Sequence, residues 1–501
     1  MSGRNRSSPP EQIEVKRMKK AISYLLILTL TFTMLFSGVS FSFAAETPRE
    51  SDSVAGEAYV EDEVLVVFED EVSQKKAETI VEDADVAAED VEEIAAPVSE
   101  ETPEATPYVV TLDEKETSVE DAVEELDKDS DVAYAQPNYL YPLEDDIVQK
   151  SASKRSISSK QWNLEKIDTQ EAWDLIDQVK GTEVKPEDKV TVAVLDTGVD
   201  LNDDNLQTAL EKYKDQCVDV TEEGNKGNEQ FEDGVYNKLD PNLTPSNSKN
   251  GHGTRVSGMI AASNGSSGLS GVASGNHQNL VDLVVVDIYE TYESADERFA
   301  TSADIVRGIE YVTGTGDSSG SENTAQDPET PELNAKVINM SIGFTANRSG
   351  ENDQYVQDAI NTAVEDGTTI VCSAGNDNTK DLWYPSDMDN VIGVISTKDY
   401  TDAFEQCKAD TSNYGSNKDI CAPGSHVPVI VSSAASNGYS SGTSYASPTV
   451  AGVAAMMYYV NPDITPAEIL EKMKSTATDL YTDGDDQYTR CGNVCSGQAI
   501  L

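Results

Sequence analysis

The stretch Ser441-Gly442-Thr443-Ser444-Tyr445-Ala446-Ser447-Pro448-Thr449-Val450-Ala451-Gly452-Val453-Ala454-Ala455-Met456-Met457 joins a short polar turn to a long run of small and apolar residues. The run ends only at Asn461-Pro462, which predicts a buried helix with Ser444 at or near its N-terminal end. Backbone N–H groups and the positive end of the helix dipole would stabilise negative charge beside the Ser444 hydroxyl. An isolated Gly-Thr-Ser tripeptide is far more often a plain turn and cap, so a catalytic role requires partners elsewhere in the chain.

A serine hydroxyl becomes a good nucleophile only when a base accepts its proton. The chain has three histidines. His277 and His426 lie in polar stretches typical of loops, and we expect both at the surface. His252 lies in Asn250-Gly251-His252-Gly253-Thr254, where the glycines leave the imidazole unobstructed ahead of a run of small residues typical of a helix. His252 is therefore the candidate base.

Asp196 is the candidate third member. It ends the continuous apolar run 190–195, which predicts a parallel strand buried on both faces. The carboxyl end of such a strand opens onto the crevice where open α/β sheets bind ligands. A carboxylate there would hold a histidine in one tautomer and stabilise its cation. Asp-Thr-Gly by itself is also compatible with a structural turn.

Together these stretches resemble the motifs of the subtilisin-like serine proteases, in the order Asp, His, Ser that distinguishes this family from other triad enzymes. Two further stretches match: residues 337–343 are similar to the strand that lines the family's substrate cleft, and residues 370–376 to its oxyanion-hole segment. The five motifs occur in order within about residues 161–475. The resemblance implies an α/β fold, namely a subtilisin-like three-layer domain with a mostly parallel central sheet, preceded by a small α+β propeptide domain.

The resemblance also implies a role for each matching residue. Ser444 would be the nucleophile, His252 the general base and Asp196 the group that orients His252. Asn376 would donate its side-chain amide to the oxyanion, alongside the backbone N–H of Ser444. An extended peptide would lie as an added strand against two edges, which consist of Ser341, Ile342, Gly343 and of Ser373, Ala374, Gly375.

The chain departs from the family pattern at three positions. Arg255 and Thr449 stand where the family has histidine, and Tyr445 stands where it often has methionine. None of these changes removes a chemical group that the mechanism needs. They therefore bear on packing and specificity more than on activity.

Length and charge restrict the possible partners. A chain of 501 residues has room for two or three domains, and its formal net charge of -55 argues against nucleic acid or an anionic membrane as a partner. We expect peptide or protein substrates and a monomer. The acidity would mildly favour cationic peptides, but a solvated acidic surface is the favoured explanation.

The first 150 residues predict a leader and a small domain. Residues 1–45 resemble a secretory signal, with basic residues at 17–20, an apolar run at 21–36 and small residues at 42–45. Secretion is therefore expected. An uncleaved membrane anchor is the alternative, because the apolar run is near spanning length, and Met18 is an alternative start to Met1.

Residues 46–150 are expected to form the inhibitory propeptide, with an unrelated acidic spacer as the alternative. Strands are predicted at 64–68, 108–112 and 132–136, helices at 73–83 and 119–126, and a loop at 95–107. The catalytic domain is expected at 151–501. The self-processing cut is expected in the linker 143–160, so that the mature enzyme begins between about Glu144 and Gln161.

The catalytic part alternates apolar runs with helical patterns, which favours βαβ units and a parallel sheet. All six cysteines of the chain lie in it, and secretion favours disulfides. The sequence does not fix the pairing, but the pairs expected from proximity are Cys491 with Cys495 and Cys407 with Cys421. Cys372 is either bonded or a free core thiol. No cofactor is required for the chemistry. Structural calcium is possible in the acidic insertions 217–249 and 314–332, but no ligand spacing is readable, so no metal residue is assigned.

Three classes of function are compatible with these motifs. The first is a secreted endopeptidase that acts through an acyl-enzyme. The second is a catalytically silent binder on the same scaffold, which the intact triad and asparagine disfavour. The third is a transpeptidase or cyclase, which only its products would distinguish.

Overall fold

The computed structural model describes residues 59–68, 72–94, 106–113, 116–143, 149–150, 161–222, 224–225, 236–239, 251–263, 265, 267–291, 298–314, 333–345, 353–399, 407–432, 436–479 and 492–493. All of them lie in one compact unit, Glu57–Leu501. The predicted signal sequence, most of the linker and the Cys491–Cys495 pair lie outside the described residues. No helix of the described residues is long and apolar enough to cross a membrane.

The larger part of the chain is built on a ten-stranded, mostly parallel sheet with the strand order β20-β21-β17-β16-β14-β12-β6-β9-β7-β8. Parallel pairing continues from β17 through β16, β14, β12, β6 and β9 to β7. The strands are β6 (Val190–Asp196), β7 (Val218–Asp219), β8 (Asn237–Lys238), β9 (Val281–Asp287), β12 (Val337–Met340), β14 (Thr369–Ser373), β16 (Val391–Thr397), β17 (Ile420–Pro423), β20 (Thr478–Asp479) and β21 (Gly492–Asn493).

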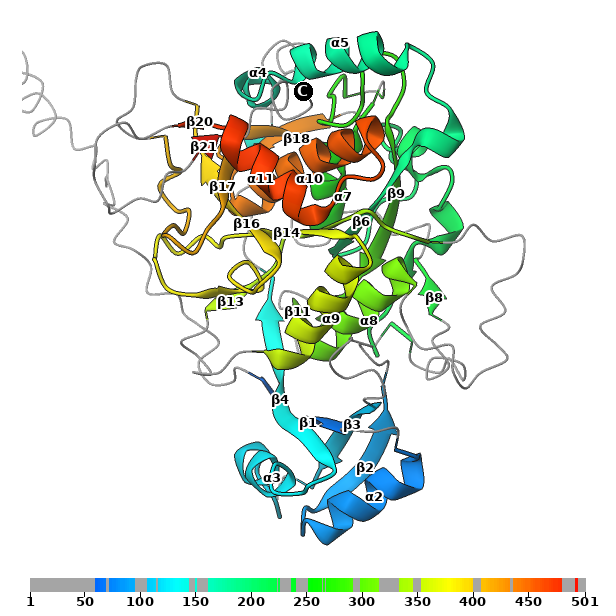
Figure 1. The fold of residues 1–501 in the computed structure, drawn as a ribbon, viewed down its shortest axis with the longest axis vertical. Coiled ribbons are helices and arrows are strands. Elements are labelled where there is room, and N and C mark those ends of the chain that lie inside the picture. The colour runs from blue at the N-terminus through cyan, green and yellow to red at the C-terminus, as the bar shows by residue number, and fades with distance from the viewer. Residues whose placement is uncertain are drawn as a thin grey trace, which may run out of the picture. The chain divides into compact units, whose positions relative to one another are not determined.

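Helices cover both faces of this sheet, which makes three layers (Figure 1). Successive strand residues point to opposite faces: Val192 and Val194 of β6 pack with α7 and α10, whereas Ala193 and Leu195 pack with α8 and α9. Both faces are apolar, as a parallel strand between two helix layers requires. The helices are α4 (Trp162–Lys166), α5 (Thr169–Lys180), α6 (Gln207–Leu210), α7 (His252–Ala261), α8 (Ser302–Thr313), α9 (Gln354–Glu365), α10 (Thr443–Val460) and α11 (Pro466–Thr476).

The strand order reverses direction at β6. After β6 the chain adds β7, β8 and β9 on one side, and later adds β12 and then β14 on the other side. Ligands of open α/β sheets bind beside the carboxyl ends of strands at such a reversal. The fold class predicted from the sequence is confirmed.

The N-terminal region is a small α+β unit. Its strands are β1 (Tyr59–Phe68), β2 (Ala88–Glu93), β3 (Thr106–Leu112) and β4 (Val132–Pro142), and its helices are α2 (Gln74–Asp83) and α3 (Val119–Leu126). The antiparallel strands and both helices enclose a separate apolar core. Ser118 caps α3, because its side chain accepts a hydrogen bond from the backbone N–H of Asp121.

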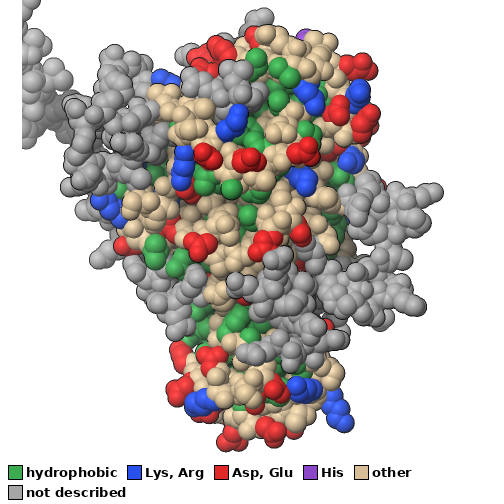
Figure 2. All heavy atoms as spheres, in the orientation of Figure 1, with side chains coloured by type: hydrophobic (Ala, Val, Ile, Leu, Met, Phe, Trp, Pro, Cys, Tyr) green, Lys and Arg blue, Asp and Glu red, His purple; other side chains and the backbone are tan. Residues whose placement is uncertain are grey.

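Short strands complete the structure: β5 (Gln149–Lys150), β10 (Glu290–Thr291), β11 (Arg298–Thr301), β13 (Phe344–Thr345), β15 (Trp383–Tyr384), β18 (Val427–Ser432) and β19 (Ser436–Ser440). Asp and Glu side chains are distributed over the face drawn in Figure 2, with Lys and Arg among them, and do not form a single patch. The acidity is thus a property of the general surface on this face.

The cysteines differ in part from the prediction. Cys421 is disulfide-bonded, but Cys407 is a free, buried thiol, so the predicted Cys407–Cys421 pair is wrong. Sequence proximity suggested the pair, and it carries no information on side-chain geometry. Cys217 and Cys372 are also free and buried, and burial raises the pKa of the Cys217 thiol to about 12 and that of Cys372 as well. Both thiols are therefore inert at neutral pH.

Candidate active site

Asp196 and His252 are in direct contact. Asp196 is the last residue of β6 and His252 the first of α7, and their side chains are almost completely buried. The Nδ1 atom of His252 lies 2.8 Å from Oδ1 and 2.9 Å from Oδ2 of Asp196. A carboxylate there favours the tautomer with a proton on Nδ1, which leaves Nε2 as the proton acceptor.

The contact between Asp196 and His252 depends on a glycine. A Cβ atom added at Gly253 would overlap the carbonyl oxygen of Gly198 and come within 3.2 Å of Oδ1 of Asp196. Only glycine allows α7 to begin so close to the end of β6. The close backbone approach predicted from the glycines around His252 is confirmed.

Ser444 is the second residue of α10, as the sequence predicts. Its side chain is nearly buried, and its backbone oxygen accepts a hydrogen bond of 3.0 Å from the hydroxyl of Ser341, directly after β12. The start of α10 is also tied to β14, because the backbone N–H of Gly375 donates to Oγ1 of Thr443 over 3.0 Å. Helix α10 packs against α7, and the ring of Tyr445 lies 6.0 Å from that of His252. Ser444 therefore lies at the start of a helix that packs against the helix of His252.

Asn376 lies at the same helix start. Its Oδ1 atom accepts the backbone N–H of Thr443 over 2.9 Å, so the amide nitrogen is the part of the group that can donate. A Cβ added at Gly442 would lie 3.6 Å from Nδ2 of Asn376 and 3.7 Å from the backbone nitrogen of Ser444. The Asn376 amide and the Ser444 backbone nitrogen therefore both lie close to Gly442 at the start of α10.

A buried chain of side-chain hydrogen bonds connects the start of α10 to the end of β12. Ser447 donates to Oδ1 of Asn339, Nδ2 of Asn339 donates to Ser341 over 3.0 Å, and Ser341 donates to the backbone of Ser444. The supporting role of Asn339 and Ser447 was not predicted from the sequence. The signal that could have found them is a polar asparagine within the apolar strand 337–340.

Two of the three departures from the family motifs form a pair. Nε of Arg255 donates a hydrogen bond of 3.0 Å to the hydroxyl of Tyr445, and both side chains are buried. Arg255 lies one helical turn after His252, and Tyr445 directly follows Ser444. Their pairing thus links α7 to α10 close to His252 and Ser444 in the sequence.

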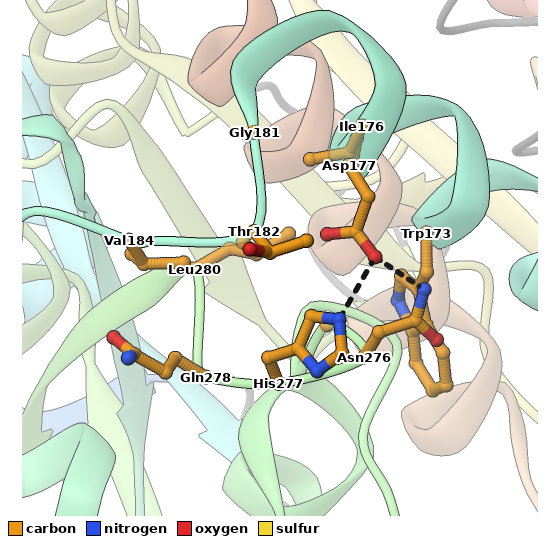
Figure 3. Close-up of a pocket in the computed structure, with 11 residues that line it drawn as sticks. Trp173, Ile176, Asp177, Gly181, Thr182, Val184, Asn276, His277, Gln278 and Leu280 are labelled. Carbon is orange, nitrogen blue, oxygen red and sulfur yellow. Dashed lines mark hydrogen bonds and ion pairs between the residues drawn. The ribbon is translucent and has the colours of Figure 1, made fainter.

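The other two histidines lie elsewhere, as predicted. His277 has about half of its side chain exposed, and its Nε2 lies 3.3 Å from Oδ2 of Asp177, which also accepts a hydrogen bond from Asn276 (Figure 3). The small pocket around this pair contains no serine or cysteine among its lining residues. His426 is exposed in the turn before β18 and stacks on Tyr439, with ring centroids 4.3 Å apart.

Both predicted cleft edges lie at the carboxyl ends of sheet strands. The first edge consists of Ser341, Ile342 and Gly343, which follow β12. The second edge consists of Ser373, the last residue of β14, and of Ala374 and Gly375, which follow it. Among the described residues, no group of three or more His, Cys, Asp or Glu is placed to hold a metal ion. Most of the two acidic insertions lies outside the described residues, so structural calcium remains a prediction.

Comparison with known proteins identifies the class. The family model described as the subtilase family matches residues 187–493, and a model of the fervidolysin N-terminal prodomain matches residues 45–138. The chain therefore belongs to the subtilase family. It is a subtilisin-like serine endopeptidase with an N-terminal prodomain.

Individual relatives agree with this assignment. A thermophilic serine proteinase of Bacillus sp. (strain AK1) is 26% identical over 97% of this chain and 99% of its own length. Thermitase of Thermoactinomyces vulgaris is 31% identical over 68% of this chain and 96% of its own length. The crystal structure of fervidolysin from Fervidobacterium pennivorans shares the fold, with a TM-score of 0.63 and 22% identity over 88% of this chain and 61% of that chain.

Proposed function

We propose that the protein is a secreted endopeptidase, made as a self-processing zymogen, with Asp196, His252 and Ser444 as its catalytic triad. The observation that carries the proposal is the double contact of Asp196 with Nδ1 of His252, at 2.8 and 2.9 Å, on a helix that packs against the helix whose second residue is Ser444. Residues 1–45 would be the signal, 46–150 the propeptide and 151–501 the mature enzyme. An anchor formed by an uncleaved N-terminal segment remains the alternative to release.

In the proposed mechanism, the Ser444 hydroxyl oxygen attacks the carbonyl carbon of the peptide, and Nε2 of His252 takes the hydroxyl proton. Asp196 stabilises the imidazolium that results. The negative charge on the carbonyl oxygen would be bound by the Asn376 amide and the Ser444 N–H. The C–N bond then breaks as His252 protonates the amine, and water releases the acyl group by the same steps. The substrate would lie between the two edges as an added strand.

Replacing Asn376 by leucine is expected to lower kcat by about 10²–10³, the cost of losing one oxyanion donor in this enzyme family, with little change in KM. Steady-state kinetics on a peptide substrate measures both constants. Asn376→Asp is the matched variant, because it can still accept the Thr443 N–H but offers no amide donor. If Asn376→Asp retains wild-type kcat, Asn376 is not an oxyanion donor.

The small N-terminal region contacts the larger part as an inhibitory propeptide would. Strand β4 pairs in antiparallel register with β11, with Leu140 opposite Thr301 and Pro142 opposite Phe299. The buried carboxylate of Asp353 caps α9 and accepts hydrogen bonds from Gln136 at 2.9 Å and from Tyr141 at 2.6 Å. These contacts support autoinhibition by the propeptide.

Glu63 should make that inhibition depend on pH. Burial raises the pKa of Glu63 to about 7, with a further contribution from Glu222, while the hydrogen bond from Asn138 lowers it. A carboxyl in the released propeptide would titrate near the ordinary value of about 4.3, so the docked form binds more protons between these two values. Docking is therefore most favourable at low pH and weakens as the pH rises through about 7.

The inhibition constant of the separated propeptide should rise about tenfold or more between pH 5 and pH 8, because one unit of pKa shift corresponds to a tenfold change in affinity. Glu63→Gln should flatten this dependence, whereas Glu89→Gln, at an exposed position on β2, should leave it unchanged. An unaltered pH profile in Glu63→Gln would show that another group is responsible.

Product analysis tests the type of reaction. The mature protein incubated with a peptide and an excess of an amine acceptor is expected to yield two fragments, the first with a free carboxylate. A product that joins the acyl fragment to the amine as the main species would favour a transpeptidase.

A further inference from the structure

The indole of Trp383 fills the space between the two cleft edges. A Cβ added at Gly343, on the first edge, would lie 2.6 Å from Cδ1 of Trp383, and one at Gly375, on the second edge, 2.6 Å from its Cδ2 and Cε2 atoms. The ring is therefore in contact with the backbone of both edges at once. Side chains pack at close to crystal density, so little room remains beside it.

The surrounding structure holds Trp383 firmly in this position. Strand β15, which begins with Trp383, pairs with β13, which directly follows Gly343. The backbone N–H of Trp383 donates to the Asp387 carboxylate over 2.7 Å, and the buried ammonium group of Lys418 is paired with that carboxylate. A ring held by its backbone in this way has little freedom to leave the gap.

Stabilisation of the core does not account for a tryptophan here. Trp383 is only 4% exposed, yet among the described residues its indole N–H has no hydrogen-bond acceptor. A buried donor without a partner is costly, and tryptophan is tolerated best where its N–H finds an acceptor. The position of the ring between two glycines of the cleft is more consistent with a role in recognition.

The gap between the edges is next to the reacting group. Gly375 directly precedes Asn376, and Ser341 on the other edge donates a hydrogen bond to the backbone of Ser444. A peptide lying between these edges with its carbonyl carbon at Ser444 would direct into this gap the side chain of the residue on the acyl side of the cut bond. That residue is called P1.

We propose that Trp383 occupies the P1 pocket and restricts cleavage to bonds that follow glycine, alanine or serine. The inference rests on the proposed function, because it requires a peptide acylated at Ser444. Larger P1 side chains would need the volume that the indole fills. The linker between the two regions contains such small residues at 151–153, 156 and 158–159, so it offers bonds of the kind that the proposal requires for self-processing.

A series of peptides that differ only at P1 tests the proposal. For the wild-type mature enzyme, kcat/KM with alanine at P1 should exceed that with phenylalanine by about 100-fold or more, the scale on which a filled pocket discriminates. Trp383→Ala should raise kcat/KM for phenylalanine and leucine at P1 by at least about tenfold and reverse or abolish the preference. Trp383→Phe should have an intermediate effect. Trp173→Phe, which makes the same change in the pocket around His277, should leave the ranking unchanged.

Two results would overturn the proposal. The proposal is wrong if the wild-type enzyme cleaves after phenylalanine or leucine as fast as after alanine. This test does not require the Trp383 variants to fold. A folded Trp383→Ala with the wild-type ranking would overturn the proposal as well. In both results the hydrolysis still depends on Ser444, so the proposed function stands. Hydrolysis of none of the peptides would instead show that the proposed function is wrong, and the inference with it.

Discussion

Replacement of Ser444 by alanine is expected to lower kcat on casein by about 10⁶-fold, the loss measured for the equivalent change in subtilisin, a member of the same family. Without the hydroxyl no acyl-enzyme can form, and only the residual effect of the oxyanion donors and of substrate binding remains. The same change should block self-processing, because in the proposed zymogen the same serine cuts the propeptide.

Casein hydrolysis and N-terminal sequencing of the purified protein measure these two effects. The wild type should begin between about Glu144 and Gln161, and Ser444→Ala should retain the propeptide. Ser425→Ala, which removes a hydroxyl from a partly exposed turn, should behave like the wild type. Normal hydrolysis and normal propeptide release in Ser444→Ala would favour a catalytically silent Ser444 and a different active site.

Asp196→Asn is expected to lower kcat by about 10⁴-fold. The asparagine amide can donate a hydrogen bond to Nδ1 of His252, which would favour the tautomer with its proton on Nε2 and prevent that atom from accepting the proton of Ser444. The two side chains have nearly the same volume, so the melting temperature should change little. Asp200→Asn is the control variant, because it makes the same change of charge four residues further on, in the loop that follows β6. A loss of less than tenfold in Asp196→Asn would show that the contact with His252 is structural.

The sequence predicted the parts of the fold in which local pattern and burial agree. The continuous apolar run 190–195 is a strand of a parallel sheet, and the small-residue runs after His252 and Ser444 are buried helices. The three residues proposed for catalysis lie at the ends of these elements, where short turn motifs are readable. Polar residues that follow an apolar element are visible in a sequence because they interrupt its pattern.

The remaining features depend on pairings that the local pattern does not encode. Strand β2 (Ala88–Glu93) was not predicted, because its one fully buried apolar residue, Val91, gives no alternation to read. The hydrogen bond between Arg255 and Tyr445 joins residues 190 positions apart, and Trp383 contacts glycines that follow two different strands. The bond of Cys421 was assigned to the wrong cysteine for the same reason.

Covalent labelling tests the central claim, that His252 makes the Ser444 hydroxyl a nucleophile. The mature protein is treated with phenylmethanesulfonyl fluoride at neutral pH, and intact mass spectrometry with peptide mapping locates the adduct. We expect one sulfonyl group per molecule, on Ser444, and almost none in His252→Ala, although that variant retains the serine. Equal labelling of His252→Ala, or active protein that carries its adduct on another residue, would contradict the account.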